Sequence, residues 1–494
     1  MLITLTAPAF AETWYIENGD ITVKASGTEG KNTVSQGNKK DVEDTNTIIT
    51  NQKTDTASFN TVTIEANGKN DKVEVTLKDV NIDTSSRNNA AVSVTGSGNT
   101  TIKLDGDNAL KSDTYRSGIY GSGSGSLTIS GGENDSLTAQ GGSGANGISS
   151  SGSLTISGGT VTANGDDGGR GISSSGSVTI SGGSTVTANG GNGTISGGDG
   201  ICSNGGVTIS GGSTVTANGG SGEDGSGGRG ISSFGGVTIS SGGTVTATGG
   251  NSTGSDGSGG DGISSTSTTI SGGTVTADGG SGNFSGGNGI RSFDVAISGG
   301  TVNVAGGNGG NGIISSDIDL SGSLELTAKA GSPNGKALSR AGRELELDTI
   351  KDKLDPGAKV TTTDANGKVN QVSIPRPVEP EESSSSSDGG SATPSAPASP
   401  LPGLTVTDKD GQRISYTSTQ SGNTLTVCVG RFTASLHVSL AALRQLRAEG
   451  IETIAFQTVL CSTTLSVDEL LAMGGEDAEA VLTHRLTDSS LTVG

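Results

Sequence analysis

Aromatic side chains are almost missing from this sequence. Only 2% of its 494 residues are aromatic and only 29% are hydrophobic. A globular protein of this chain length normally contains more large apolar residues, so a conventional globular core is excluded. Low hydrophobicity with abundant Gly and Ser could indicate disorder, but Val and Ile recur periodically within the glycine-rich tract. Stacked repeats share one core between neighbours, so the periodicity favours a repeat protein over a disordered one.

Basic side chains and histidines are also scarce. The sequence contains 30 Lys and Arg residues against 50 Asp and Glu residues, which gives a formal net charge of -20. This excess of acid argues against nucleic acid and against an anionic membrane surface as partners. The two histidines, His437 and His484, both lie near the C-terminus, so a histidine-centred site in the repeats is excluded. No stretch reaches the ~18 to 20 apolar residues of a membrane helix, so no transmembrane segment is predicted. Separately, we expect the protein to be a monomer.

A short apolar stretch opens the chain. In MLITLTAPAFAETW it ends at Ala9-Phe10-Ala11, a small-x-small cleavage pattern without the usual positive n-region. We interpret residues 1–11 as the remnant of a signal peptide and Glu12 as the mature start, with a disordered tail as the alternative. Cys428 and Cys461 could form a disulfide if the protein is exported. Cys202 stands where most repeats have Ser, and we interpret it as an outward, serine-like substitution.

A three-part repeat fills residues 113–330. The motifs x-Gly-Ile, V/L-T-I-S-G-G and T-V-T-A recur in this order, and successive x-Gly-Ile motifs are 23 to 32 residues apart. This spacing predicts one coil of a parallel β-helix with three strands. Eight to ten coils, stacked at about 4.8 Å, would make a rod on the order of 40 to 50 Å long.

Strand alternation predicts which side chains of each coil face the core. In the coil that begins at residue 172, the residues predicted to point inward are Ile172, Val178, Ile180, Val186 and Ala188. The residues predicted to point outward are Thr179, Ser181, Thr185 and Thr187. The Gly-Gly pair after the second strand is expected to supply a positive φ at a tight corner.

The flanking segments differ in composition from the repeats. Residues 12–112 are predicted to form an N-terminal cap and the first coils, and residues 331–375 a C-terminal cap. Residues 376–403 are rich in Pro, Ser and acid, as a linker is. Residues 404–494 are predicted to form a small α+β domain, with a helix whose stripe of Leu440, Leu443 and Leu446 ends before Gly450.

Length variation between coils falls on one corner, from the third strand to the next x-Gly-Ile. The separation is 11 residues from Val161 to Ile172 and 18 from Val245 to Ile263. Variable loops on one edge often mark the binding side of a repeat protein, although neutral drift is the alternative. The candidate binding residues are the acids of these loops: Asp166, Asp167, Glu223, Asp224, Asp256 and Asp261.

Carboxylates are also the side chains that Ca²⁺ prefers. The candidate calcium ligands are Asp166, Asp167, Glu223 and Asp224. Their spacing matches neither an EF-hand nor the nine-residue GGxGxD repeat, so acidic loops that are simply solvated are the alternative.

The residue before Gly-Ile changes from coil to coil in an ordered way. The positions that would stack into a ladder are Asn146, Arg170, Asp199, Arg229, Asp261, Asn288 and Asn311. Alternating charge and amide pairs would fix the register between coils. We therefore assign these residues a structural role rather than a ligand role.

Part of the repeat region resembles a known family. The runs VEVTLKDVNID, AAVSVTGSGNTTIKLDGDNAL and SGIYGSGSGSLTISGG, with the later GGTVTA units, resemble exported bacterial carbohydrate-binding domain-containing proteins of the pectate-lyase-like type. The resemblance covers roughly residues 60–330. It implies a right-handed parallel β-helix, Ca²⁺-assisted polysaccharide binding and no required catalysis.

The sequence thus predicts an all-β, right-handed parallel β-helix with a small C-terminal α+β domain. The expected role is non-catalytic binding of polysaccharide or cell-surface glycan by a secreted or surface-attached bacterial protein. It would require no cofactor, although Ca²⁺ could assist. A surface adhesin or stalk that binds no sugar is the main alternative, because aromatic platforms are few. Two minor alternatives are a polysaccharide lyase and, from five stacked T-x-T pairs, an ice-binding protein.

Overall fold

The computed structural model describes residues 12–28, 30–240, 242–375 and 403–493, except 409–410, 415, 422, 430, 432, 459–461, 474–478 and 485–488. The chain divides into two compact units, Met1–Glu379 and Pro380–Gly494, which we describe separately. The predicted signal-peptide remnant, residues 1–11, and residues 376–402 of the predicted linker lie outside the described residues.

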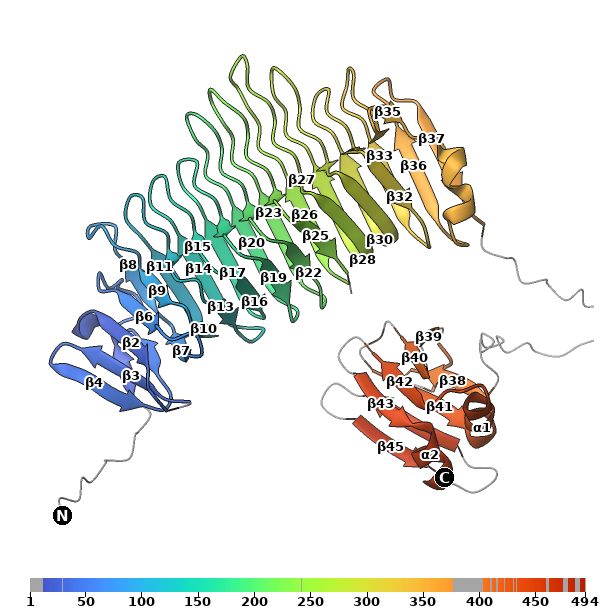
Figure 1. Cartoon of the computed structure of the whole chain (residues 1–494), viewed down its shortest axis with the longest axis horizontal. Coiled ribbons are helices and arrows are strands. Elements are labelled where there is room, and N and C mark those ends of the chain that lie inside the picture. The colour runs from blue at the N-terminus through green and yellow to red at the C-terminus, as the bar shows by residue number, and fades with distance from the viewer. Residues whose placement is uncertain are drawn as a thin grey trace, which may run out of the picture. The chain divides into compact units, whose positions relative to one another are not determined.

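The first unit is a parallel β-solenoid of about 13 turns, and it confirms the predicted fold class (Figure 1). Each regular coil gives one strand to a 15-stranded sheet and two strands to a 22-stranded sheet. In one such coil these are β18 (Ile172–Ser174), β19 (Val178–Ser181) and β20 (Thr185–Asn189). Three short strands per coil are what the three-part repeat predicts.

The strands of the 15-stranded sheet follow the x-Gly-Ile motifs in the regular coils. They are β6 (Val62–Ala66), β9 (Val92–Gly96), β12 (Ile119–Gly121), β15 (Ile148–Ser150), β18, β21 (Ile201–Ser203), β24 (Ile231–Ser233), β27 (Ile263–Ser264), β29 (Ile290–Arg291), β31 (Ile313–Ser315) and β34 (Leu338–Arg340), with β2 (Ile21–Ala25), β3 (Asn32–Gln36), β4 (Lys39–Asp44) and β35 (Arg343–Glu344) at its ends.

The larger sheet collects the other two strands of each coil. Its regular pairs are β7 (Lys72–Lys78) and β8 (Asn81–Asp83), β10 (Asn99–Asp105) and β11 (Asp107–Lys111), β13 (Leu127–Ser130) and β14 (Ser136–Gln140), β16 (Leu154–Ser157) and β17 (Thr160–Asn164), β19 and β20, β22 (Val207–Ile209) and β23 (Thr214–Asn218), β25 (Gly236–Ile239) and β26 (Thr244–Thr248), and β32 (Asp317–Leu320) and β33 (Glu325–Lys329). In two coils the pair is continuous, as β28 (Ser267–Asp278) and β30 (Asp294–Ala305).

The core is a column of aliphatic side chains, as predicted. Ile172, Val178, Ile180, Val186 and Ala188 are at most 1% exposed. Each pairs in register with its equivalent in the next coil; Ile180, for example, lies opposite Ile209. Burial of each Ile or Val side chain stabilises the fold by about 1.5 to 3 kcal/mol, so the regular coils are stable without aromatic rings in their interior.

Glycine is required at two kinds of position in the coil. Gly182 and Gly183 have φ values of 69° and 71°, which confirms the predicted tight corner after the second strand. At the glycine of x-Gly-Ile, close backbone packing excludes a side chain. A Cβ on Gly200, for example, would lie 2.7 Å from the backbone nitrogen of Asn218. This glycine lets the start of one strand lie against the end of another.

The rod has more coils than predicted: it has about 13 turns, whereas eight to ten were expected. The additional turns lie at the two ends, where the sequence lacks the x-Gly-Ile motif. Strands β6 and β9 pair in parallel ahead of β12, and β34 extends the same sheet after β31. Their strand pattern continues although the glycine motif does not.

Antiparallel strands close the ends of the rod. Strands β3 and β4 form a hairpin on β2 at the N-terminal end, and β35 turns back on β34 at the other end. The larger sheet ends with β36 (Lys359–Thr363), which pairs with β33, and with antiparallel β37 (Val369–Ser373). Its N-terminal end carries β1 (Thr13–Tyr15) and β5 (Ile48–Thr50), while 3-10 helices η1 (Ile16–Asn18) and η2 (Leu347–Lys353) lie near the two ends. Such closures protect edges that would otherwise pair with another chain.

The second unit has two four-stranded sheets and two short helices, which confirms the predicted α+β domain. One sheet contains β38 (Leu404–Thr407), β41 (Ala434–Ser439), β44 (Glu479–His484) and β45 (Ser489–Val493); the other contains β39 (Thr417–Ser421), β40 (Thr424–Cys428), β42 (Thr453–Gln457) and β43 (Ser462–Ser466). Helix α1 (Leu440–Ala448) buries the predicted stripe of Leu440, Leu443 and Leu446, and α2 is Val467–Met473. No helix among the described residues is long and apolar enough to cross a membrane.

Candidate functional site

The variable loops lie along one edge of the rod. Figure 1 shows the connections that follow the second strand of the larger sheet projecting from one side, and they are longest near the middle of the solenoid. Backbone hydrogen bonds run between successive loops, for example from Gly168 to Asn192 and from Gly193 to Ser221. The loops therefore form a continuous layered surface.

The ladder positions before Gly-Ile are in contact from coil to coil. The Arg170 Nε lies 3.4 Å from the Asp199 carboxylate, and the Arg229 Nε lies 4.0 Å from that of Asp261. The arginine side chains are 46% and 44% exposed. Each pair therefore contributes only about 0.2 to 1 kcal/mol.

A second role of this ladder was not anticipated from the sequence. The side-chain oxygen of an Asn or Asp at this position accepts the backbone N–H of the equivalent residue one coil later. Asn146 accepts in this way from Arg170 at 2.8 Å, and Asp199 accepts from Arg229 at 2.8 Å. The same contact continues from Asn288 to Asn311 and from Asn311 to Lys336. The signal was the recurrence of Asn or Asp, whose side chains bind nearby backbone donors.

Asp261 was predicted both as a loop ligand and as a ladder residue. The structure places it in the ladder, where the residue is 4% exposed. Its carboxylate lies 3.2 Å from the Arg291 Nε and accepts two hydrogen bonds from Asn288. Because these partners surround it, Asp261 is not available to an external ligand.

The structure does not bring the four candidate calcium ligands together. Asp166 and Asp167 lie in one loop, whereas Glu223 and Asp224 lie two coils further along, beyond the loop that contains Gly193. The Asp167 carboxylate accepts a hydrogen bond from Ser143. Among the described residues, no group of three His, Cys, Asp or Glu side chains could hold a metal ion. Asp256 is exposed in the loop before Asp261.

A hollow of about 510 Å³ lies where the third strands meet the loops near the N-terminal half of the edge. Its lining is polar and includes Lys111, Asp113, Gln140 and Asp166. Asp166 is thus the one predicted binding residue that borders this hollow. Its lining, with hydrogen-bonding groups of both signs, suits a neutral hydroxylated ligand better than a strongly charged one.

A larger groove of about 750 Å³ lies at the N-terminal end of the rod. It is bordered by the segment after β2 and by β7, and its lining includes Asn32, Asn46, Asn70, Asp71, Glu74 and Asn99. The Asn32 amide donates to the Glu74 carbonyl at 2.7 Å and so fixes one wall. The sequence did not predict this groove, because it forms between an irregular hairpin and the first coils.

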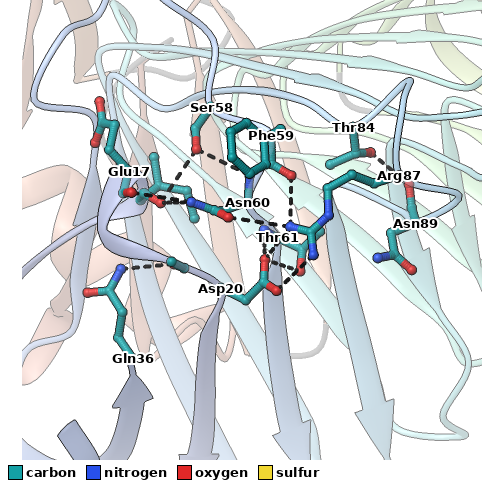
Figure 2. A network of polar contacts seen from close by, with 12 residues as sticks. Glu17, Asp20, Gln36, Ser58, Phe59, Asn60, Thr61, Thr84, Arg87 and Asn89 are labelled. Carbon is teal, nitrogen blue, oxygen red and sulfur yellow. Dashed lines mark hydrogen bonds and ion pairs between the residues drawn. The ribbon is translucent and has the colours of Figure 1, made fainter. Parts of the chain in front are cut away.

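A polar network joins the first loops of the edge. Figure 2 shows Arg87 reaching Asp20, with Phe59 and Asn60 beside it; the two Arg87–Asp20 bonds are 2.7 and 3.1 Å long. Burial acts in the opposite direction, but the hydrogen bond and charge of Arg87 lower the pKa of Asp20 below its ordinary value. The Arg87 guanidinium also lies 5.8 Å from the centre of the Phe59 ring.

The aromatic residues of the rod face solvent. Eight aromatic residues fall within residues 12–375, and only Trp14 is buried, at 1% exposure. The other seven are Tyr15, Phe59, Tyr115, Tyr120, Phe234, Phe284 and Phe293, with exposures from 37% to 77%. The sequence leaves open whether Phe234 and Phe293 point into the core or outward. Their side chains are 69% and 68% exposed, so both are surface residues.

Several polar ladders were missed by the sequence reasoning. The asparagine that follows T-V-T-A forms one, because the Asn189 amide donates to Asn164 at 2.8 Å and the Asn218 amide to Asn189 at 2.9 Å. Asp278 occupies the equivalent position two coils later, where burial raises the pKa of its carboxyl. The repeated T-V-T-A-N was visible but could also be read as an exposed strand end.

The T-x-T pairs stack in register on the outer face of the larger sheet. Thr185 lies opposite Thr160 and Thr214, and the pattern continues through Thr244 to Thr274. This arrangement gives a regular grid of hydroxyl and methyl groups. Ice binding by this grid stays a prediction.

The cysteines differ in their surroundings. Cys202 is 4% exposed on the outer side of its strand, and burial raises the pKa of its thiol. It is therefore covered by its neighbours rather than openly exposed. Cys428 has no disulfide partner within the part of the chain that the structure describes, and its thiol lies 3.2 Å from the Gln457 side-chain oxygen. Cys461 lies outside the described residues, so its pairing with Cys428 stays a prediction.

Comparison with known proteins adds no relative. No family model matches the chain, and neither the curated proteins nor the solved structures contain a significant match. What is established is the architecture, a parallel β-solenoid of about 13 turns with a small α+β unit.

Proposed function

We propose that this protein binds polysaccharide without catalysis, through the outer surface of the solenoid. The observation that carries the proposal is the exposure of seven of the eight aromatic residues in the rod. Exposing a large apolar ring to water is unfavourable. One exposed ring is common on protein surfaces and needs no explanation, but exposure of seven of eight rings does. A chain that has few rings and presents nearly all of them outside is suited to ligands that stack on aromatic faces.

The loop edge would provide the polar contacts. The hollow that includes Lys111, Gln140 and Asp166 offers donors and acceptors for sugar hydroxyls, and the Tyr115 ring is exposed in a loop of the same edge at 77%. Contacts repeated from coil to coil are individually weak but act together on a polymer. Because the carboxylates of the described residues form no metal site by themselves, Ca²⁺ would assist as a bridge between a single loop carboxylate and hydroxyl groups of the glycan.

The location outside the cell belongs to the same proposal. The small-x-small pattern at Ala9-Phe10-Ala11 and the resemblance of residues 60–330 support a secreted or surface-attached bacterial protein. A net charge of -20 suits solubility there.

A stalk that binds no sugar is the second candidate, and a specific observation favours it. The ladder from Asn146 to Asn311 and the asparagine ladder from Asn164 to Asn218 use side chains to join coils rather than to leave them free. Such ladders stiffen a rod, which suits a spacer that holds the C-terminal unit.

A glycan array probed with the full chain, with and without EDTA, tests the proposal. Binding to a set of related glycans supports it, and loss of this binding in EDTA assigns a role to Ca²⁺. Absence of binding to every glycan in both conditions contradicts it and favours the stalk.

A further inference from the structure

The geometry points to Phe234 and Phe293 as a two-ring platform that binds an extended β-1,4-linked glycan lying parallel to the rod axis. This inference rests on the proposed function and adds the class of sugar and the residues that recognise it. It places the recognition on the short corner between the two sheets, away from the variable loops.

The two phenylalanines occupy the same corner of the coil. Each follows the isoleucine of x-Gly-Ile by three residues, at the connection between a strand of the 15-stranded sheet and the first strand of the larger sheet. They are 69% and 68% exposed. Thr266, also exposed, has this position in the intervening coil.

Backbone hydrogen bonds fix the corner on both sides of the platform. The Phe234 N–H donates to the Ser203 carbonyl at 2.9 Å, and the Phe293 N–H donates to the Thr266 carbonyl at 3.0 Å. Thr266 in turn donates its N–H to the Gly235 carbonyl at 3.0 Å. These bonds link four successive coils, so the two rings are carried by a rigid ladder rather than by mobile loops.

The spacing of the rings selects the ligand. Two coils separate them, and coils stack at about 4.8 Å, so the rings are on the order of 10 Å apart along the axis. In an extended β-1,4-linked chain, equivalent sugar faces recur with each disaccharide, close to this distance. Such sugars have flat faces of C–H groups that can pack on an aromatic ring. An α-linked glucan coils and does not present its faces along a straight line.

The exposed rings of Phe59 and Phe284 lie at other positions of the coil. Phe59 lies against the Arg87 guanidinium, whose centre is 5.8 Å from the ring. Phe284 lies in a variable loop, where its N–H donates to Gly257. It shares its high exposure with Phe293 but not its corner, which makes it the matched control.

Affinity electrophoresis of the full chain in gels that contain hydroxyethylcellulose or soluble starch tests the inference, with cellohexaose titration calorimetry as the quantitative measure. We expect retardation in hydroxyethylcellulose only. Phe234→Ala and Phe293→Ala should each weaken cellohexaose binding by roughly ten-fold, the effect of about 1.4 kcal/mol. Phe284→Ala should change it less than two-fold. Circular dichroism melting of each variant checks that the rod is folded.

A swap variant tests the spacing itself. Thr266→Phe combined with Phe293→Thr keeps two phenylalanines at the corner but separates them by one coil instead of two. If spacing selects the glycan, this variant binds cellohexaose as weakly as Phe293→Ala. Unchanged affinity in the swap variant overturns the role of spacing and with it the inference.

Three further results overturn the inference in distinguishable ways. If Phe284→Ala abolishes glycan binding while Phe234→Ala and Phe293→Ala leave it unchanged, the loop edge binds the glycan and only the inference fails. If the wild-type chain binds no glycan at all, the proposed function fails as well. If sedimentation shows a dimer that Phe234→Ala and Phe293→Ala dissociate, and these variants keep wild-type glycan affinity, the corner is a contact between two copies instead.

Discussion

The side-chain amide of Asn288 donates a 2.8 Å hydrogen bond to Oδ1 of Asp261, and the Asn288 backbone N–H donates to the same oxygen at 2.8 Å. One carboxylate oxygen thus joins two coils twice. The ladder of which it is part holds the rod in register, while the outer surface remains free for ligands.

Replacing Asp261 should destabilise the rod. Asp261→Ala leaves the buried Asn288 N–H without its acceptor, and we expect a loss of about 1 to 3 kcal/mol. Asp261→Asn keeps an acceptor oxygen and loses the charge beside Arg229 and Arg291, so its loss of stability should be smaller. Asp256→Ala, in the exposed part of the preceding loop, is the control. Thermal unfolding followed by circular dichroism measures all three, and equal midpoints for Asp261→Ala and Asp256→Ala would contradict the structural role.

Shortening a core side chain should lower the free energy of unfolding more than shortening an outer one. Ile180 is 0% exposed, and Ile180→Ala should lower stability by about 2 to 5 kcal/mol because it leaves a cavity between coils. Thr179→Ala, on the outer side of the same strand, should change stability by less than about 0.5 kcal/mol. Urea unfolding compares the two. Similar losses in both variants would mean that the column of aliphatic residues is not the core.

Cys202 should react slowly with thiol reagents in the folded protein. Burial raises the pKa of its thiol and restricts access to it. In a chain with Cys428→Ser and Cys461→Ser, the reaction of Cys202 with DTNB at pH 8 should be at least ten-fold slower than that of a cysteine introduced by Ser175→Cys in a Cys202→Ser background. Ser175 is exposed at the short corner. Equal rates would show that Cys202 is open to solvent.

The C-terminal unit should lose stability in mild acid because of His484. Its imidazole packs 4.8 Å from the Phe456 ring and contacts Thr463 at 2.9 Å, and burial lowers its pKa below the ordinary 6.5. Because the unfolded state then binds the proton more readily, the stability contribution is present above pH 6.5 and is lost as the pH falls below that value.

Proton NMR checks this directly, because the chain has only two histidines. The His484 signal, assigned with His484→Gln, should titrate below pH 6.5. A titration midpoint at or above 6.5 would contradict the burial of a neutral imidazole.

The repeat unit was predictable because its physics is local. Alternation places Val178 and Ile180 inside, and paired glycines such as Gly182 and Gly183 need a positive φ. The first coils were expected within residues 12–112 from strand alternation alone, whereas residues 331–375 were predicted only as a cap and contain the further coil strand β34, which keeps the strand pattern without the glycine motif. The candidate site was only partly predictable. The position of Asp261 directly before Gly-Ile predicted its place in the ladder, but its burial and the exposure of Asp256 depend on contacts with the neighbouring coil, which the sequence does not show.

The outward direction of the rings could not be read from sequence either. Phe234 and Phe293 lie at a corner, where strand alternation no longer determines the side-chain direction. Hydrogen bonds to the neighbouring coil, such as those from Phe234 to Ser203 and from Phe293 to Thr266, set the course of the chain there.

The most direct test of glycan binding by the outward rings is affinity electrophoresis of the full chain against a variant in which the five most exposed rings are replaced by serine: Phe59, Tyr115, Phe234, Phe284 and Phe293. The wild-type chain should be retarded in a gel containing a soluble β-glycan, and the variant should migrate as in a gel without polysaccharide. Equal retardation of both chains, or of neither, would contradict glycan binding by these rings.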